Sequence, residues 1–316
     1  MGLLFVISLL IGLVMLVIGA EMLVRGGGQL ALALRVPALV VGLTIVAFGT
    51  STPELCVSLA AAFRASTDMA LANVNGSNIA NIALVLGAAA LVSPLKVERT
   101  LIWREVPVCI VLQLAVAVAC LGRGVSQLEG LILLIMGVAY NGWILREAMR
   151  GRGPRPDDVE ELEKKQLFAY LAMLVVGLVI LVIGAGLFVD GAVKFAGKLG
   201  MSPRYVGVTV VALGTSAPEV VTAVVSAYRG QVELAVGNSL GSNILNISMV
   251  LGITAMIKPI EMTDPSAWMD IWVAFFATLV MAVVVIRGRL SRFDGVILIA
   301  GYLLYIFLAG QPGVGP

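Results

Sequence analysis

Two glutamates lie within apolar segments, and each of them directly follows a proline. Glu54 follows Pro53, and Glu219 follows Pro218. A charge held in the middle of a membrane costs at least about 2.5–3.5 kcal/mol, so it persists where another group compensates it. No lysine or arginine lies within ten residues before either glutamate, and the chain has no histidine. A bound cation is therefore the partner that we expect for these carboxylates.

The prolines suggest how further oxygen ligands arise beside the carboxylates. Proline has no N–H, and its ring clashes with the carbonyl four residues earlier, where Gly49 and Gly214 stand. We expect each helix to kink or break here and to free carbonyl oxygens. Free carbonyls at membrane depth are tolerated where they face protein or a cavity. Thr50 and Thr215 stand four residues before the glutamates and share their helix face.

The next segment of each region carries polar side chains at every fourth position. They are Asn73, Ser77 and Asn81, and then Asn238, Ser242 and Asn246. Carboxylate, amide, hydroxyl and carbonyl oxygens suit hard cations such as calcium or sodium and argue against zinc, copper or iron. Small and polar residues at this spacing also pack membrane helices together. Packing therefore explains one such segment alone, but it does not explain two prolyl-glutamates without basic partners.

The composition requires a membrane. Of 316 residues, 60% are hydrophobic and 13% charged, and the mean hydropathy is +1.04. Soluble domains carry roughly a quarter charged residues, so this chain cannot cover itself with a water-compatible surface. A spanning helix needs about 20 apolar residues, so the length allows roughly ten spans. The scattered cysteines, Cys56, Cys109 and Cys120, are interpreted as small apolar side chains.

The composition and motifs also exclude several classes of function. A net charge of +2 is too small to indicate a nucleic-acid partner. The chain has no His-Glu metal motif, no nucleophile with a base and no phosphate-binding loop, so we expect no enzyme activity. No tightly bound cofactor is expected.

The chain repeats itself at a constant offset of 165 residues. Gly42–Glu54 matches Gly207–Glu219 at nine of thirteen positions, and Asn73–Asn81 matches Asn238–Asn246 at six of nine. The register extends over residues 6–145 and 171–310 without a gap. Chance similarity between apolar segments does not keep polar residues in register over this length, so the chain contains two copies of one unit.

The predicted fold class is an all-α integral membrane protein with ten transmembrane helices. The spans are expected at 3–24, 36–63, 68–93, 101–121 and 126–147, then at 167–189, 202–228, 232–257, 268–287 and 291–310. The domains are a first five-helix repeat at 1–147, a linker at 148–166 and a second repeat at 167–316. Five is an odd number, so the second repeat is expected to be inverted, as in many secondary transporters.

Lysine and arginine counts indicate an orientation in the cell membrane. With the N-terminus outside, fifteen basic residues fall on the cytoplasmic side and six outside. This bias favours the orientation over its mirror image. Both termini are therefore predicted to be extracytoplasmic and the linker cytoplasmic.

The duplicated Gly-Thr-Ser-x-Pro-Glu and Gly-Ser-Asn-Ile-x-Asn segments resemble the two alpha-repeats of the sodium/calcium exchanger family, prokaryotic type, within the cation/calcium antiporter superfamily. The resemblance covers essentially the whole chain. It implies ion sites clustered at mid-membrane between the second, third, seventh and eighth helices. It also implies a secondary antiporter that exchanges sodium for calcium by alternating access.

The resemblance also assigns roles to residues of this chain. It implies a central calcium site made of Glu54, Glu219 and the carbonyls of Thr50 and Thr215. A sodium site on one side would use the Ala47 carbonyl, Thr50, Glu54 and Ser77. A sodium site on the other side would use the Ala212 carbonyl, Thr215, Ser216, Glu219 and Ser242. Ser51 matches Ser216 and can join the outer sodium site. Asn81 and Asn246 complete the middle.

One position departs from part of the family. Some members have an aspartate where this chain has Asn246. The site here holds two carboxylates, which weakens the case for potassium co-transport. The expected partners are calcium and sodium ions and the lipid bilayer. The chain is compatible with a monomer, but the sequence does not determine the oligomeric state. Calcium/proton exchange is the nearest alternative, and an uncoupled cation channel is a more distant one.

Overall fold

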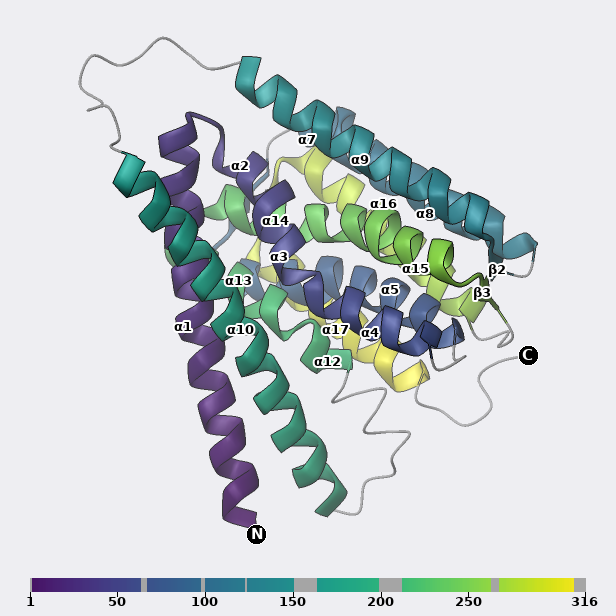
Figure 1. Ribbon diagram of the computed structural model, residues 1–316, viewed down its shortest axis with the longest axis horizontal. Coiled ribbons are helices and arrows are strands. Elements are labelled where there is room, and N and C mark those ends of the chain that lie inside the picture. The colour runs from purple at the N-terminus through teal and green to yellow at the C-terminus, as the bar shows by residue number, and fades with distance from the viewer. Residues whose placement is uncertain are drawn as a thin grey trace.

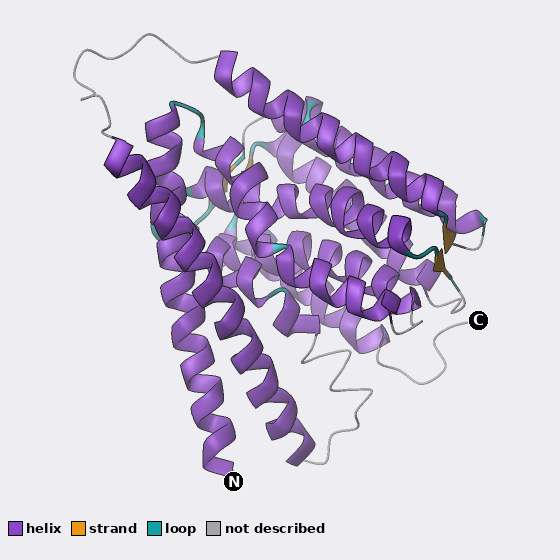
Figure 2. Ribbon diagram, in the orientation of Figure 1, coloured by secondary structure: helices purple, strands orange, loops and turns teal. Residues whose placement is uncertain are grey.

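The structure is a computed structural model, which describes residues 2–63, 67–97, 100–122, 124–150, 164–198, 212–262 and 267–309. Nearly all of the described chain is helical (Figure 2). Within these ranges, seven helices are long and apolar enough to cross a membrane, or eight if one bent pair is counted as a single span. The helical membrane fold is thus confirmed, while the arrangement of ten helices stays a prediction.

Two long helices lie side by side at one edge of the molecule (Figure 1). They are α1 (Gly2–Leu34) and α10 (Lys164–Lys198), and both are longer than the predicted spans 3–24 and 167–189. Charge does not end α1 at Arg25, because Arg25 pairs with Glu21 one turn earlier. The helix ends after Leu34, where Arg35 adopts the left-handed φ of 56° and Pro37 follows.

Glycines let α1 and α10 approach closely. A Cβ atom on Gly19 would lie 2.7 Å from the carbonyl oxygen of Gly177, and one on Gly184 would lie 2.9 Å from the backbone nitrogen of Leu16. No larger side chain fits at either position without separating the helices. The opposite sides of both helices expose large apolar side chains, as a lipid-facing pair requires.

The second predicted span is broken, as expected from its proline. It consists of α2 (Ala38–Val41), the π-helical segment η1 (Gly42–Val46), α3 (Ala47–Thr50) and α4 (Thr52–Phe63). The two parts are bent by 41° at Ser51. Pro53 lies in the first turn of α4, where backbone N–H groups need no partner within the helix.

The second copy is broken in the same way. It contains α12 (Ala212–Thr215) and α13 (Ala217–Tyr228), with Ser216 between them. The first part of the predicted span 202–228 lies outside the described residues.

Two helices between these breaks form the centre of the bundle. One consists of α5 (Thr67–Ala80), η2 (Asn81–Val85) and α6 (Leu86–Val92). The other consists of α14 (Val232–Leu245), η4 (Asn246–Leu251) and α15 (Gly252–Ile257). Both have short π-helical segments, which the sequence did not predict, and both are largely buried.

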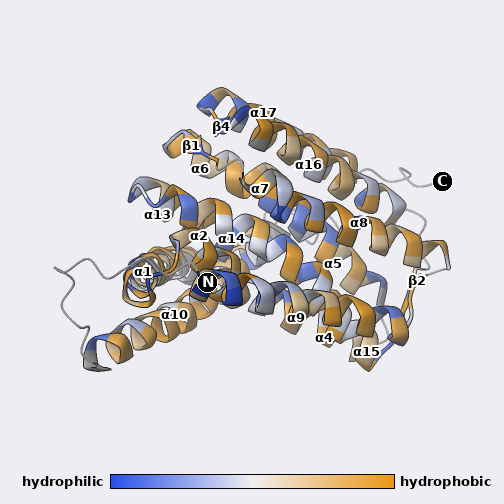
Figure 3. Cartoon of the chain, turned by 90° about the horizontal axis from the view of Figure 1, so that it is seen from above, coloured by the Kyte–Doolittle hydropathy of each residue, from blue (hydrophilic) through white to orange (hydrophobic). Residues whose placement is uncertain are grey.

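Apolar helices surround this centre (Figure 3), and large hydrophobic side chains are exposed on them. These helices are α7 (Thr100–Trp103), α8 (Glu105–Leu121), α9 (Gln127–Arg150), α16 (Ala267–Arg287) and α17 (Arg292–Ala309). At 17 residues, α8 is short for a membrane span. Helices α9 and α10 each extend three residues into the predicted linker, whose residues 151–163 lie outside the described chain.

Two short antiparallel strand pairs join the sequence halves. β1 (Leu95–Lys96) pairs with β4 (Arg289–Leu290), with Leu95 opposite Leu290. β2 (Gly124–Val125) pairs with β3 (Ile260–Glu261), with Val125 opposite Ile260. Each pair therefore ties one end of the first half to the second half.

Candidate cation site

The two glutamates lie in the first turns of α4 and α13, immediately after the helix breaks. The exposed fractions of Glu54 and Glu219 are 0% and 1%. The carboxylates are close enough to interact electrostatically. The positive ends of the helix dipoles favour negative charge at both positions. The fold therefore brings together two acidic groups that are 165 residues apart in sequence.

The carboxylate oxygens have no conventional partners. All four lack a hydrogen bond within the described residues, and the ion pairs formed there involve other acids. Ser77 is the hydroxyl neighbour of Glu54, and Thr50 is that of Glu219, although their geometry falls short of hydrogen bonds to the carboxylates. Buried charges without partners are costly, so a cation would be strongly favoured here.

Thr50 connects the first helix break to the central helix of the second copy. Its Oγ1 lies 3.1 Å from Oδ1 of Asn238, to which it donates, and 3.5 Å from Oγ of Ser242. It also lies 3.4 Å from the carbonyl oxygen of Ala47, which accepts the backbone N–H of Ser51 at 3.0 Å. The Ala47 carbonyl therefore keeps a helical bond, although the resemblance assigns it to an ion.

An asparagine network surrounds the starts of η2 and η4. Nδ2 of Asn246 donates to Oδ1 of Asn78 at 3.1 Å. Nδ2 of Asn243 donates to the backbone carbonyl of Asn78 at 3.3 Å, and the Ser239 hydroxyl donates to that of Asn81 at 2.7 Å. Both amide atoms of Asn81 are buried and lack a hydrogen-bond partner among the described residues.

Some of these contacts involve residues that were not selected from the sequence. Asn78, Asn243 and Ser239 were passed over, although Asn78 and Asn243 match across the repeat. That match was a usable signal. Asn78 and Asn243 do not fall on the four-residue spacing that selected the other polar residues. Contacts between the two central helices depend on how the helices pack, which spacing along one helix does not show.

The predicted ligands lie along the two breaks and the two central helices. Ala47 and Thr50 bound α3, Ala212 and Thr215 bound α12, Ser51 and Ser216 lie in the breaks, Ser77 and Ser242 lie in α5 and α14, and Asn81 and Asn246 open η2 and η4. The hydroxyls of Ser51 and Ser216 are buried and lack partners within the described residues. Within those ranges, no cluster of three or more acidic, histidine or cysteine side chains occurs. The site thus combines two carboxylates with neutral oxygens, a donor set that hard cations accept.

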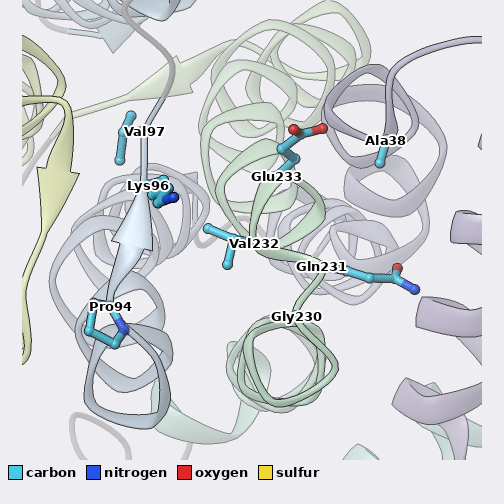
Figure 4. Close-up of a pocket in the computed structure, with 8 residues that line it drawn as sticks. All are labelled: Ala38, Pro94, Lys96, Val97, Gly230, Gln231, Val232 and Glu233. Atoms are coloured by element: carbon cyan, nitrogen blue, oxygen red, sulfur yellow. The ribbon is translucent and has the colours of Figure 1, made fainter.

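A cavity of about 670 Å³ lies elsewhere, at the start of α14 (Figure 4). Lys96 lies on its strand side, and Glu233 lies toward Ala38 of α2 (Figure 4). None of the predicted ligands lines it. Its opposed charges and the lysine on its wall make it a poor cation site, so the glutamate cluster remains the candidate.

Family comparison connects this geometry with known proteins. The family model described as sodium/calcium exchanger protein matches residues 4–145 and 169–310. The chain belongs to this family. Each matched region carries one helix break and one of the two glutamates, so the family match covers every predicted ligand.

Individual relatives cover nearly the whole chain. CaxA of Alkalimonas amylolytica is 35% identical over 96% of this chain and 97% of its own. The sodium/calcium exchanger MaX1 of Methanosarcina acetivorans is 32% identical over 94% of this chain and 96% of its own. The solved structure of the sodium-calcium exchanger NCX_Mj superposes with a TM-score of 0.85 at 30% identity, over 97% of this chain and 99% of NCX_Mj.

These findings confirm the resemblance based on the two duplicated motifs. The protein is a multi-pass membrane protein of an exchanger family, and its family membership supports cation/calcium antiport. A family of exchangers also agrees with the expectation that the chain is not an enzyme.

Proposed function

We propose that this protein is a secondary antiporter that exchanges sodium for calcium at a site centred on Glu54 and Glu219. One observation carries the proposal: the two carboxylates are fully buried and close enough to interact electrostatically, and their oxygens have no hydrogen bond within the described residues. A permanent partner would make the pair structural. A pair without one is suited to a cation that arrives and leaves.

The charges explain why the ions would exchange. Two ionised carboxylates carry a charge of −2, which one calcium ion or two sodium ions neutralise. Both sets together would overload the site, so calcium and sodium compete. An empty site would carry uncompensated charge across an apolar barrier, which is costly. Access therefore alternates between the two sides when the site is filled, and leak without exchange is suppressed.

Neutral oxygens would complete the coordination. Their proposed sources are the carbonyls of Ala47 and Ala212, the hydroxyls or carbonyls of Thr50, Thr215, Ser51, Ser216, Ser77 and Ser242, and the amides of Asn81 and Asn246. With amides at both middle positions, the site has two carboxylates, which weakens the case for potassium co-transport with calcium.

The proposed architecture is ten helices in two inverted repeats, divided at the linker 148–166. The strand pairs support the inversion. β1 and β2 flank the segment that contains α8, so a spanning segment would place them on opposite sides of the membrane. β3 is the repeat equivalent of β1, but it pairs with β2. Equivalent points of the two repeats would then lie on opposite sides of the membrane. The lysine and arginine counts support the orientation with both termini outside and the linker in the cytoplasm.

The relatives support the choice of ions. MaX1 bears the name sodium/calcium exchanger, and NCX_Mj structures were obtained after soaking with sodium and with calcium or strontium. Calcium/proton exchange remains the second candidate, because buried carboxylates without hydrogen-bond partners could take protons in place of sodium.

Radiolabelled calcium uptake into proteoliposomes tests the proposal. Purified protein is reconstituted with sodium, potassium or choline inside, and a pH gradient is imposed on a matched choline set. Uptake that requires internal sodium is the expected result. Uptake driven by the pH gradient alone would replace sodium with protons, and large calcium currents without any counter-ion would indicate a channel.

A further inference from the structure

The orientation of the Asn246 amide is fixed by one neighbouring side chain. Nδ2 of Asn246 donates to Oδ1 of Asn78 at 3.1 Å. Asn246 is 0% exposed and Asn78 is 2% exposed, so water does not compete for this bond. Oδ1 of Asn246 is buried and lacks a hydrogen-bond partner among the described residues. The nitrogen is therefore occupied, and the oxygen is left available.

We propose that Asn78 is a positioning residue that makes Asn246 present its oxygen, rather than its NH₂ group, to the transported cation. This inference rests on the proposed function. A carboxamide has one end that accepts and one that donates, and calcium and sodium require oxygen. A rotated amide would direct N–H groups at the ion and bring two acceptor oxygens together at Asn78.

The surroundings of Asn246 agree with this role. Ser242 stands four residues earlier on the same helix, so the two side chains share one face. Oγ of Ser242 lies 3.5 Å from Oγ1 of Thr50, which is the neighbour of the Glu219 carboxylate. The amide oxygen thus belongs to the helix face that carries the site. Asn243 makes a second contact with Asn78, because its Nδ2 donates to the backbone carbonyl of Asn78.

The equivalent position in the first copy is not controlled in this way. Asn81 corresponds to Asn246, yet neither of its amide atoms has a hydrogen-bond partner within the described residues. The Ser239 hydroxyl donates to the backbone carbonyl of Asn81 and not to its amide. Orientation control therefore acts on the second-copy amide.

Asn78→Ala in two backgrounds tests the inference. The first is the natural chain, and the second carries Asn246→Asp, whose two oxygens leave no wrong orientation. In the natural background, Asn78→Ala should leave the Asn246 oxygen without a fixed orientation toward the cation. The calcium concentration for half-maximal sodium-driven uptake should then rise about tenfold. In the Asn246→Asp background, the increase should be about threefold or less.

Asn75→Ala is the matched control for a purely structural loss. Asn75 is 1% exposed on the same helix, donates to the Leu71 carbonyl and accepts from Gln113. It should leave calcium dependence unchanged. The calcium-dependent rise in melting temperature in detergent measures binding without turnover and should follow the uptake data.

Three outcomes would overturn the inference. Equal losses from Asn78→Ala in the two backgrounds, or a loss matched by Asn75→Ala, would make Asn78 structural. Absence of calcium binding in Asn246→Asp would show that an oxygen at this position is not the relevant feature. Wild-type protein without sodium-driven calcium uptake would overturn the proposed function and this inference with it, whereas the first two results leave the proposed function intact.

Discussion

The two copies of the motif have nearly the same sequence but different hydrogen bonds. In the first copy, Nδ2 of Asn73 donates to the Glu54 carbonyl at 3.1 Å and to the Ser58 hydroxyl at 3.0 Å. In the second copy, Oδ1 of Asn238 accepts from Thr50, and Nδ2 lacks a partner among the described residues. Ala223 stands where the first copy has Ser58. The first asparagine is thus held within its own repeat and the second is held across the repeats.

This difference shows how a duplicated site becomes asymmetric. The glutamates are equivalent in charge and in helix position, but both of their hydroxyl neighbours, Ser77 beside Glu54 and Thr50 beside Glu219, come from the first repeat. Thr50 of the first copy donates a hydrogen bond to Asn238 and neighbours Glu219, both in the second copy. A change on one copy should therefore affect the other, and the size of that effect measures how far the equivalence of the copies extends.

The largest effect is expected where the two copies are most alike. Glu54→Gln and Glu219→Gln each remove one of the two charges that neutralise the ion. Each should lower sodium-driven calcium uptake at least about 100-fold, since a lost charged ligand costs about 3 kcal/mol. Proteoliposome uptake measures the loss, and size-exclusion chromatography with a melting curve checks that the variants remain folded. Normal uptake by the double variant would refute the assignment of the site.

A smaller effect should expose the contact between copies. Thr50→Val keeps the shape of the side chain but removes the hydroxyl that donates to Asn238. Calcium affinity should fall about tenfold, because the change leaves buried oxygens unsatisfied and removes a neighbour of Glu219. Titration of calcium-dependent uptake gives this value. Thr50→Ser, which retains the hydroxyl, is the control, and its calcium affinity should stay within about threefold of wild type. A loss of affinity in Thr50→Ser as large as that in Thr50→Val would show that the hydroxyl is not responsible.

The smallest effect concerns the position at which the copies differ. Ser58→Ala removes one partner of Asn73, and Ala223→Ser places a hydroxyl at the position of the second copy that corresponds to Ser58. One buried hydrogen bond contributes about 0.5–1.5 kcal/mol. The melting temperature should fall slightly in Ser58→Ala and rise in Ala223→Ser, with little change in uptake. Opposite shifts would mean that packing, rather than hydrogen bonding, separates the copies.

The sequence was sufficient for the features that depend on chemical type and on distance along the chain. Apolar composition required a membrane, the constant offset established a duplication, and Pro53 predicted the break that the structure has at Ser51. Glu54 and Glu219 stood out because an acid without a basic neighbour is expensive in an apolar segment. The family match then confirmed the resemblance based on these residues.

The sequence was insufficient where the outcome depended on a neighbouring helix. It ended the first span near residue 24, but α1 continues to Leu34. Arg25 lies inside this helix and pairs with Glu21, which also pairs with Arg229 at the end of α13. It also gave no reason to prefer one orientation of the Asn246 amide. Amide orientation, the π-helical segments and the contact from Thr50 to Asn238 depend on which side chains from other helices lie within about 3 Å. Spacing along one helix does not contain that information, so only the tertiary structure decided them.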